Sequence, residues 1–363
     1  MTTNPFPRRA IAVALAATAV LAACGGGDDD SASTTETPTT RATTTTEATT
    51  TTEATTTTTT IPTTTTAPPT FPLTGVPAGN ALAALRPSIV VKIDNHRDAR
   101  PQAGLNQADI VYEEIVEGIT RFFTIFQSTD AAPVGPIRSA RTQDVDLLNQ
   151  LNRPLFVWSG GNRNVVNAIG NANAISMAHG QGPGFCRDRR GRRVATEHTL
   201  FNEGTSTIYS RLDPSQGTPP AFFSYRPAGT PSTGQPVTSI NLGMDGVPVT
   251  WTWDPTGKTW VRNEYGEVHM DNAGTPVNTP NVLVQFVNYR PSPADRRSPE
   301  AVTVGEGDAW IFSDGKLTFA RWSRPDPSRP AVFTDAGGKQ VLLSPGRTWI
   351  ELAEAGVTPV GYA

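Results

Sequence analysis

Apolar and polar residues alternate in short blocks along most of this chain, and in its first half the blocks predict strands mixed with helices. Short apolar runs rich in Val and Ile and bounded by turn residues are typical of buried strands. Apolar residues spaced three or four apart, in a run that ends before a proline, are typical of helices. The predicted strands span 88–93, 110–127 (as two strands) and 155–158, and the predicted helices span 142–151, 164–169 and 199–212.

The second half has a different pattern, because short apolar runs follow one another with turn residues between them. The stretch 217–234, rich in Pro, Gly, Ser and Thr, predicts a boundary between two domains, 71–225 and 235–363. We expect the fold class α+β, with a mixed α/β domain followed by a mostly β domain built as a small sandwich or barrel-like sheet. The strands predicted in the second domain span 247–253, 259–262, 282–288, 310–312, 317–322, 341–343 and 348–352.

The segment 110–127 can be placed in register if Glu117-Gly118 forms a two-residue hairpin turn. Because side chains alternate strictly between the two faces of a strand, Glu114 then lies opposite Arg121 on one face. Both faces of this hairpin are largely apolar, which predicts that it is covered on both sides. The register therefore predicts a partly buried contact between the Glu114 carboxylate and the Arg121 guanidinium.

Residues 1–23 have the layout of a secretory signal peptide. Arg8 and Arg9 precede an apolar run that ends in small residues at Ala23. This run is shorter than the roughly 20 apolar residues that span a bilayer. Leu21-Ala22-Ala23-Cys24 resembles a bacterial lipobox, which implies a lipid on Cys24 and a chain anchored at the extracytoplasmic face of the bacterial cell membrane. The alternative is an ordinary secretory peptide followed by a chance cysteine.

Residues 24–70 join this predicted anchor to the folded part. Twenty-four of the forty residues from Ser31 to Thr70 are Thr, and the stretch has no apolar periodicity. Such a segment cannot bury enough apolar surface to offset the entropy of folding, which predicts a disordered tether. A flexible coil of this length has an end-to-end distance of roughly 35 Å.

Composition narrows the function classes. A net charge of −3 over 363 residues gives no strong global field, so we expect no nucleic-acid partner. If Cys24 carries a lipid, Cys186 has no partner and an intrachain disulfide is excluded. The four His residues form no HExxH motif and no zinc spacing with Cys, so we expect no metal and no cofactor.

Charged residues concentrate between Asp94 and Arg141, and they leave two interpretations open. One is a site for an anionic or sugar-containing ligand, because guanidinium groups bind anions and carboxylates bind hydroxyls. The other is a structural network that holds the strand register, as buried ion pairs can do. The candidate ligand-binding residues are Asp94, His96, Arg100, Glu114, Glu117, Arg121, Arg138 and Arg141.

Two weaker signals lie outside this segment. Five of the seven residues from Arg187 to Arg193 are Arg, and we expect a solvated loop there with Cys186 as an inert thiol beside it. Six of the seven Trp residues lie in the second half, where core packing and a sugar-binding platform are the two interpretations.

The motifs of the charged segment resemble the YerB-like family of bacterial lipoproteins. The resemblance rests on Asp94-Asn-His96, Ala99-Arg-Pro-Gln102, Gln107–Glu113, Thr120-Arg-Phe122 and Gly135–Arg141, and in the second half on Trp253-Asp-Pro255 and Leu343-Ser-Pro-Gly346. It covers nearly all of 71–363 and implies two adjoining domains of unknown function. The lipobox and the tether fit it, whereas the turn at Glu117-Gly118 departs from it, since many members have one residue more.

These observations predict a membrane-anchored surface lipoprotein that binds a cell-envelope component, whether a wall glycan, an anionic polymer or an envelope protein. The alternative is a hydrolase of the wall or of a polysaccharide, with Glu114 or Glu117 as acid/base and Asp94 or His96 as partner. A glycosidase needs its two carboxylates about 5–9.5 Å apart across an open cleft. A third class, a structural scaffold, is indicated if the charged cluster is wholly internal.

Overall fold

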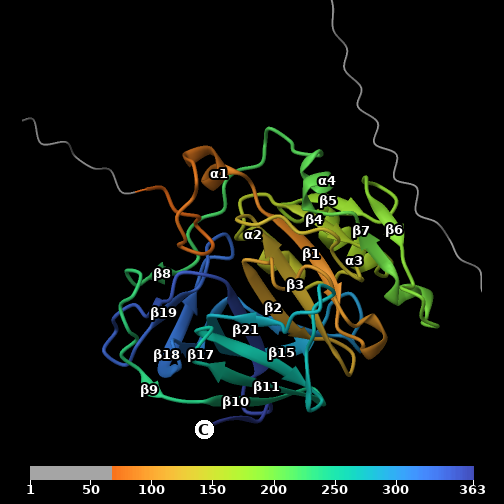
Figure 1. The fold of residues 1–363 in the computed structure, drawn as a ribbon. Coiled ribbons are helices and arrows are strands. Elements are labelled where there is room, and N and C mark those ends of the chain that lie inside the picture. Colours follow the sequence, from red (N-terminus) through yellow and green to blue (C-terminus); the bar gives the residue numbers. More distant parts are fainter. Residues whose placement is uncertain (1–67) are drawn as a thin grey trace, which may run out of the picture. The chain divides into compact units, whose positions relative to one another are not determined.

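Strands from both halves of the chain form one twelve-stranded sheet in the computed structural model, which describes residues 68–363 (Figure 1). The two halves meet where β2 pairs in parallel with β21, from Ile110 opposite Thr348 to Glu113 opposite Glu351. The strands, in spatial order, are β19 (Val332–Thr334), β18 (Lys316–Arg324), β17 (Gly305–Ser313), β15 (Asn281–Pro291), β21 (Thr348–Glu354), β2 (Ile110–Ile115), β3 (Thr120–Phe126), β1 (Ile89–Asp94), β4 (Leu155–Trp158) and β5 (Ile175–Ala178), with β16 (Pro299–Val302) beside β15 and β9 (Gln235–Pro236) beside β18.

A second sheet of six strands is built entirely from the C-terminal half, and two short pairs of strands complete the β structure. The six-stranded sheet contains β13 (Glu267–Val268), β12 (Thr259–Glu264), β11 (Val247–Asp254), β10 (Ser239–Met244) and β22 (Val360–Tyr362), with β14 (Asn278–Thr279) beside β12; the short pairs are β20 (Leu342–Leu343) with β8 (Ser224–Tyr225) and β6 (Phe185–Arg187) with β7 (Leu200–Asn202).

The helices are short and belong to the N-terminal half. The side chain of Asn162 caps the third of them by accepting the backbone N–H of Val165 (3.0 Å), as an N-cap residue does. The helices are α1 (Ala81–Leu85), α2 (Asp144–Asn149), α3 (Arg163–Gly170) and α4 (Thr205–Tyr209), and two 3₁₀ turns span Arg97–Ala99 and Thr196–His198. No helix in 68–363 combines the length and the apolar character needed to cross a membrane.

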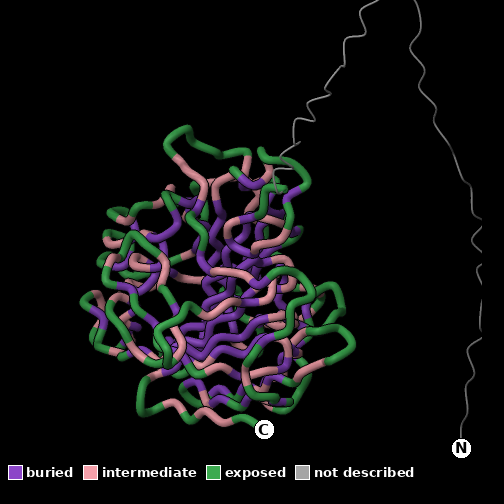
Figure 2. The backbone as a smooth tube through the Cα atoms, turned by 90° about the vertical axis from the view of Figure 1, so that its left-hand side faces the viewer, coloured by how far each residue is buried: buried purple, intermediate pink, exposed green. Residues whose placement is uncertain are grey.

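The large sheet separates two hydrophobic cores, and alternation along its strands sends neighbouring residues to opposite cores. In β1, Ile89, Val91 and Ile93 pack with the six-stranded sheet and α4, whereas Val90 packs with α2 and α3. Every residue of β1, β2 and β3 is buried, so these central strands lie within the buried backbone that runs through the middle of Figure 2. The fold class α+β is thereby confirmed, with mixed α/β structure first and mostly β structure after it.

The expectation of a self-contained sandwich or barrel-like sheet in the second half is wrong. Seven of its strands join the five strands of the first half in the twelve-stranded sheet, and only the six-stranded sheet is its own. The reason is that β21 inserts between β15 and β2, so that each half completes the edge of the other. The stretch 217–234 crosses between the halves, and residues 68–363 belong to one compact unit.

The predicted hairpin register is confirmed. Glu114 lies opposite Arg121 across β2 and β3, and the backbone N–H of Val116 donates to the Ile119 carbonyl (2.8 Å) around the two-residue turn. The predicted signal peptide, Cys24 and the predicted tether up to residue 67 lie outside the described residues.

Candidate functional site

The site lies where β1 and β4 separate at their carboxyl ends. These parallel strands pair only from Ile89 to Val91, and the segment Pro136–Ala140 then runs between them. On one side the Arg138 N–H donates to the Lys92 carbonyl, and on the other the Ser159 N–H donates to the Arg138 carbonyl (2.9 Å each). Ligands bind preferentially in crevices at the carboxyl ends of parallel strands, which is where this segment places its side chains.

Three guanidinium groups meet there: Arg121 from β3 and Arg138 and Arg141 from the inserted segment; we call them the strand-end arginine cluster. Arg121 is 4% exposed, and its Nη1 donates to the Ser139 carbonyl (3.2 Å) while its Nε has no partner. Among residues 68–363, no carboxylate lies within 4.0 Å of it. Burial and the neighbouring Arg141 and Arg138 lower the pKa of Arg121 to about 10.

Arg138 and His198 share one buried carboxylate. Asp94 Oδ2 lies 3.2 Å from Arg138 Nε and 2.6 Å from His198 Nδ1, and the Asp94 side chain has no exposed surface. Burial alone raises the pKa of Asp94, but the His198 hydrogen bond and the Arg138 charge outweigh it, so the net pKa is lowered. Asp94 is therefore ionised, and it orients the Arg138 guanidinium and the His198 ring at the edge of the sheet.

His96 stacks on His198 at the surface side of this carboxylate. Their ring centroids are 4.3 Å apart with an interplanar angle of 11°. His96, Asp98 and His198 are the group in 68–363 whose donor atoms, within 4.8 Å of one another, could hold a metal ion. His96 Nδ1 already accepts the Asp98 N–H (3.1 Å), so that nitrogen is occupied by a local turn, and the expectation of no metal site stays a prediction.

Arg141 binds Glu117 at the hairpin turn through two hydrogen bonds, from Nη2 to Oε2 (2.6 Å) and from Nε to Oε1 (3.1 Å). The Ser298 hydroxyl also donates to Glu117. Burial raises the pKa of Glu117, but the bonds from Arg141 and Ser298 outweigh it and lower the pKa to about 2. Glu117 is 41% exposed, so this pair forms the outer rim of the cluster.

The predicted contact between Glu114 and Arg121 is wrong, although the two residues are cross-strand neighbours. Lys92 on β1 reaches over the Phe123 ring and forms the ion pair with Glu114, and it also binds Asp144 (2.7 Å). Glu114 has no exposed surface, and burial raises its pKa to about 8. The register places Glu114 and Arg121 on one face of the sheet, but it does not determine which groups their side chains contact.

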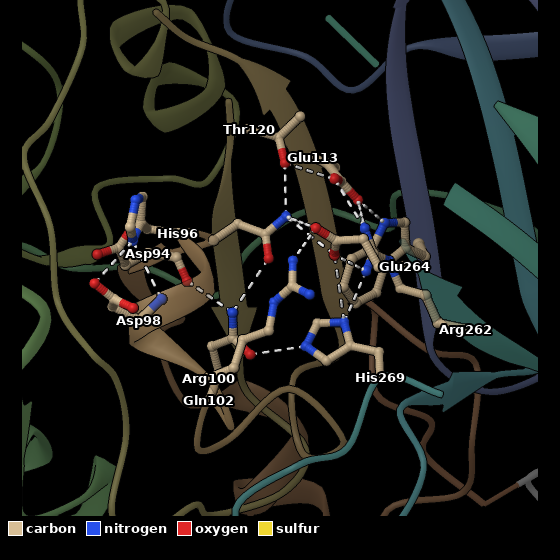
Figure 3. A network of polar contacts seen from close by, with 12 residues as sticks. Asp94, His96, Asp98, Arg100, Gln102, Glu113, Thr120, Arg262, Glu264 and His269 are labelled. Atoms are coloured by element: carbon tan, nitrogen blue, oxygen red, sulfur yellow. Dashed lines mark hydrogen bonds and ion pairs between the residues drawn. The ribbon is translucent and has the colours of Figure 1, made fainter. Parts of the chain in front are cut away.

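Arg100 lies in a second polar network, on the opposite face of the sheet from Arg121. It pairs with Glu264 of the six-stranded sheet, and its guanidinium lies over the Tyr265 ring (5.4 Å). Arg100 therefore does not converge with Arg138, Arg141 and His96 around one pocket. Gln102 joins the two regions, because its amide donates to the Asp94 carbonyl (3.0 Å), as Figure 3 shows.

Arg262 is the centre of that second network. Its Nη2 donates to both carboxylate oxygens of Glu113 (2.9 and 2.8 Å), and its Nη1 binds Glu264. Burial opposes its charge, but Glu113 and Glu264 outweigh burial and raise the pKa of Arg262. Burial and Arg262 hold the pKa of His269 well below its usual range, so a neutral ring accepts from Arg262 (2.7 Å) and donates to Gln102 (2.7 Å).

The arginine-rich loop supports the site from outside. Arg190 donates to the Ala99 carbonyl (3.0 Å) and lies over the Phe201 ring, and Arg192 donates to the Asp98 carbonyl (3.1 Å). These bonds hold the turn that carries His96, so part of the run is structural. Burial and the carboxylates of Glu203 and Asp188 raise the pKa of Cys186, the reverse of what a nucleophilic thiol requires.

The sequence thus indicated Arg121 and both arginines of the inserted segment, but it did not indicate several other charged residues of the two polar networks. His198 was noted only as one of four histidines, and nothing local marked Lys92 inside its apolar strand. A lysine among β-branched residues was a usable signal, because a lysine is almost never fully buried without a partner. The residues missed are Lys92, Asp144, His198, Arg262, Glu264 and His269.

Comparisons with known proteins agree with the fold. Residues 73–215 match the family described as "Protein of unknown function (DUF3048) N-terminal domain", and residues 239–350 match its C-terminal domain. "Putative lipoprotein YerB" of Bacillus subtilis (strain 168) is 29% identical over 289 residues, which cover 77% of this chain and 85% of that protein. The crystal structure of the YerB protein from Bacillus subtilis superposes with a TM-score of 0.67 at 24% identity, covering 80% of this chain and 99% of that one.

Proposed function

Because the chain belongs to the YerB-like family with its paired DUF3048 domains, whose description assigns no activity, we propose a function from the site itself. The strand-end arginine cluster binds an oxyanion, a phosphate or carboxylate group carried by an anionic polymer of the cell envelope. The protein is in this proposal a binding protein and not an enzyme.

One observation carries the proposal: Arg121 is a buried cation that no carboxylate of residues 68–363 contacts, and the charges of Asp94 and Glu117 only partly offset its burial. Taking an ion out of water costs several kcal/mol, and only a well-placed opposite charge repays that cost. Asp94 is engaged by His198 and Arg138, and Glu117 by Arg141 and Ser298, so neither pairs with Arg121. An oxyanion at the open edge of the cluster would supply the missing charge.

The residue types suit this ligand. A planar guanidinium presents paired N–H donors that match the spacing of carboxylate and phosphate oxygens. Arg138 and Arg141 are partly exposed, at 21% and 14% of their side chains, whereas Arg121 lies beneath them. The outer two arginines can meet an anion arriving from solvent, and the inner one can hold it.

The predicted location points to the source of the anion. The expected lipid on Cys24 and the expected tether would hold the domains near the membrane surface, within reach of wall polymers. The relative's name describes a lipoprotein, which supports the same placement for this chain. We therefore favour a polymer that bears phosphate or carboxylate groups over a soluble metabolite.

The alternative hydrolase is less well supported. Glu114 has no exposed surface and is held by Lys92, so it does not face a substrate. Glu117 has a pKa lowered to about 2, which leaves it ionised near neutral pH and unable to donate a proton as a general acid. The pKa of Glu114 is raised, as that of a glycosidase acid is, but its side chain has no access to solvent or substrate, and the accessible Glu117 has a lowered pKa.

The test is a binding measurement with purified cell wall, with and without prior removal of its anionic polymers, and with inorganic phosphate as a competing probe. We expect wild-type protein to bind intact wall and to lose that binding in Arg121→Met. Arg211→Met, which removes an exposed arginine outside the cluster, is the matched control and should bind normally. Affinity should fall as salt rises, because the attraction is between charges.

Two results would overturn the proposal. The first is binding by Arg121→Met equal to that of wild type; the second is equal binding to wall from which the anionic polymers have been removed. Circular dichroism of each variant shows that the comparison is made on folded protein.

A further inference from the structure

A cluster of aromatic rings lies at the outer part of the large sheet, away from both polar networks. It contains Phe286 of β15, Trp310 of β17, Phe319 of β18 and Tyr362 of β22; we call it the outer aromatic cluster. Five strand spacings separate β17 from β1, which is about 24 Å at the usual spacing within a sheet. The cluster is therefore distinct from the strand-end arginine cluster.

The sheet register builds this cluster. Trp310 lies directly opposite Phe319 across β17 and β18, and Asp308 lies opposite Arg321 two residues along. Trp310 is the central ring, with centroid distances of 5.5 Å to Phe286, 5.4 Å to Phe319 and 5.5 Å to Tyr362. All three contacts are edge-to-face, the arrangement that aromatic pairs prefer.

The rings are open to solvent to an extent that core packing does not explain. Phe319 is 47% exposed and Tyr362 is 41% exposed. Trp310 borders a hollow of about 350 Å³ that Phe286, Phe319 and Asp308 also line. Large aromatic rings left in contact with water in one place are typical of binding surfaces.

The indole N–H of Trp310 differs from those of several other tryptophans. Trp251 donates to Glu351 (2.8 Å), Trp322 donates to the Phe286 carbonyl (2.8 Å) and Trp158 donates to Ser176 (2.9 Å). Within 68–363 the Trp310 N–H has no protein partner, and it is not among the buried unpaired atoms. Trp310 thus offers an apolar ring and a donor in contact with solvent.

Polar groups stand at the rim of the hollow. Asp308 Oδ1 accepts from Arg321 Nη1 (2.9 Å), and Glu306 lies 3.7 Å from Arg321. All three side chains are more than half exposed. A carboxylate with a guanidinium beside it accepts from and donates to hydroxyl groups at once.

We propose that the outer aromatic cluster binds a pyranose unit of a wall glycan. A pyranose has an apolar face of C–H bonds, which packs on an aromatic ring, and a rim of hydroxyls, which Asp308 and Arg321 can bind. The hollow has the size of a small-ligand site, with apolar walls and a few polar groups. A stable protein interface needs about 800 Å² per partner, far more than one such hollow provides.

This inference goes beyond the proposed function and does not depend on it. The strand-end arginine cluster would hold a charged group, whereas the outer aromatic cluster would hold an uncharged sugar ring. A ligand without any anionic group therefore tests the second site alone.

The experiment titrates the protein with the uncharged oligosaccharide tetra-N-acetylchitotetraose and follows tryptophan fluorescence and the heat of binding. We expect saturable binding in wild type, and losses of about tenfold in affinity in Trp310→Ala and Phe319→Ala, equal to about 1.4 kcal/mol each. Asp308→Asn should weaken binding severalfold. Leu212→Ala, which truncates a residue outside the cluster with nearly the same exposure as Phe319 (48% against 47%), should bind as wild type.

Three outcomes would overturn the proposal: no saturable binding in wild type, equal affinity in Phe319→Ala, or a self-association of wild type that Phe319→Ala abolishes. The last would make the cluster an interface between copies of the chain. Because Phe319 is exposed and sits on the sheet surface, its truncation leaves the fold intact, which keeps the result interpretable if Trp310→Ala fails to fold.

Discussion

Arg262 of the six-stranded sheet and Arg121 of the twelve-stranded sheet are both buried guanidinium groups, yet their surroundings are opposite. Arg262 is 0% exposed and meets two carboxylates, Glu113 and Glu264, which raise its pKa. Arg121 is 4% exposed and meets two other arginines, which together with burial lower its pKa to about 10. The first region pairs its central cation with carboxylates and joins the two sheets. In the second region Asp94 and Glu117 pair with Arg138 and Arg141, so no carboxylate of residues 68–363 contacts Arg121.

This difference distinguishes the charged residues that hold the fold together from those that we propose bind a ligand. In the first region the carboxylates balance the charge of Arg262, although its Nε has no partner, so the network is stable without a ligand. A buried cation that no carboxylate contacts costs free energy in the empty protein, and such a cost is expected where a ligand will repay it. We therefore assign Arg100, Glu113 and Glu264 to the structural network and Arg121, Arg138 and Arg141 to the proposed site.

The largest change in the free energy of unfolding should come from Arg262→Met, which removes the central cation of the second polar network. The substitution leaves Glu113 and Glu264 buried without their common partner, and breaking a buried pair in this way costs about 3–5 kcal/mol. Urea unfolding followed by circular dichroism would measure the loss. The double variant Arg262→Met with Glu113→Gln should recover part of the lost stability; an undiminished stability in the single variant would contradict the comparison.

The same arginine-to-methionine substitution in the strand-end arginine cluster should raise the free energy of unfolding, whereas Arg262→Met lowers it. Arg121→Met removes a buried cation that no carboxylate of residues 68–363 contacts, so we expect the unfolding free energy of the ligand-free protein to rise by about 1–3 kcal/mol. The gain should appear in urea unfolding at low phosphate and shrink when a bound anion stabilises wild type by mass action. A loss as large as that in Arg262→Met would show that Arg121 is part of the structural framework instead.

The smallest effect concerns Glu117 at the rim, and it depends on pH. Its pKa is about 2 in the folded protein against 4.5 unfolded, so its contribution is complete above about pH 4.5 and disappears as the pH falls towards 2. Because the side chain is 41% exposed, solvent screening limits this contribution to about 0.5 kcal/mol. The free energies of unfolding of wild type and Glu117→Gln should differ at pH 6 and converge near pH 2. A difference that stays constant with pH would mean that the charge of Glu117 does not cause it.

The limits of prediction are visible in one hairpin. Strict alternation and a two-residue turn were enough to place Glu114 opposite Arg121, because the backbone geometry of a hairpin is local. The same reasoning failed for the contact between them, because the competing Lys92 comes from β1, on the far side of β3. Glu113, the next residue, points to the other face and binds Arg262, which lies 149 residues away along the chain.

The amino-acid sequence by itself determined where half of the strands lie, the fold class, the hairpin register and the segment in which arginines and carboxylates gather. These features follow from periodicity and turn chemistry, which act over a few neighbouring residues. Only the tertiary structure decided that the halves share one sheet, that Arg100 and Arg121 lie on opposite faces, and which buried cation in 68–363 no carboxylate contacts. Charge balance in a protein interior depends on the packing of segments distant in sequence, and alternation within a strand carries no information about what covers its two faces.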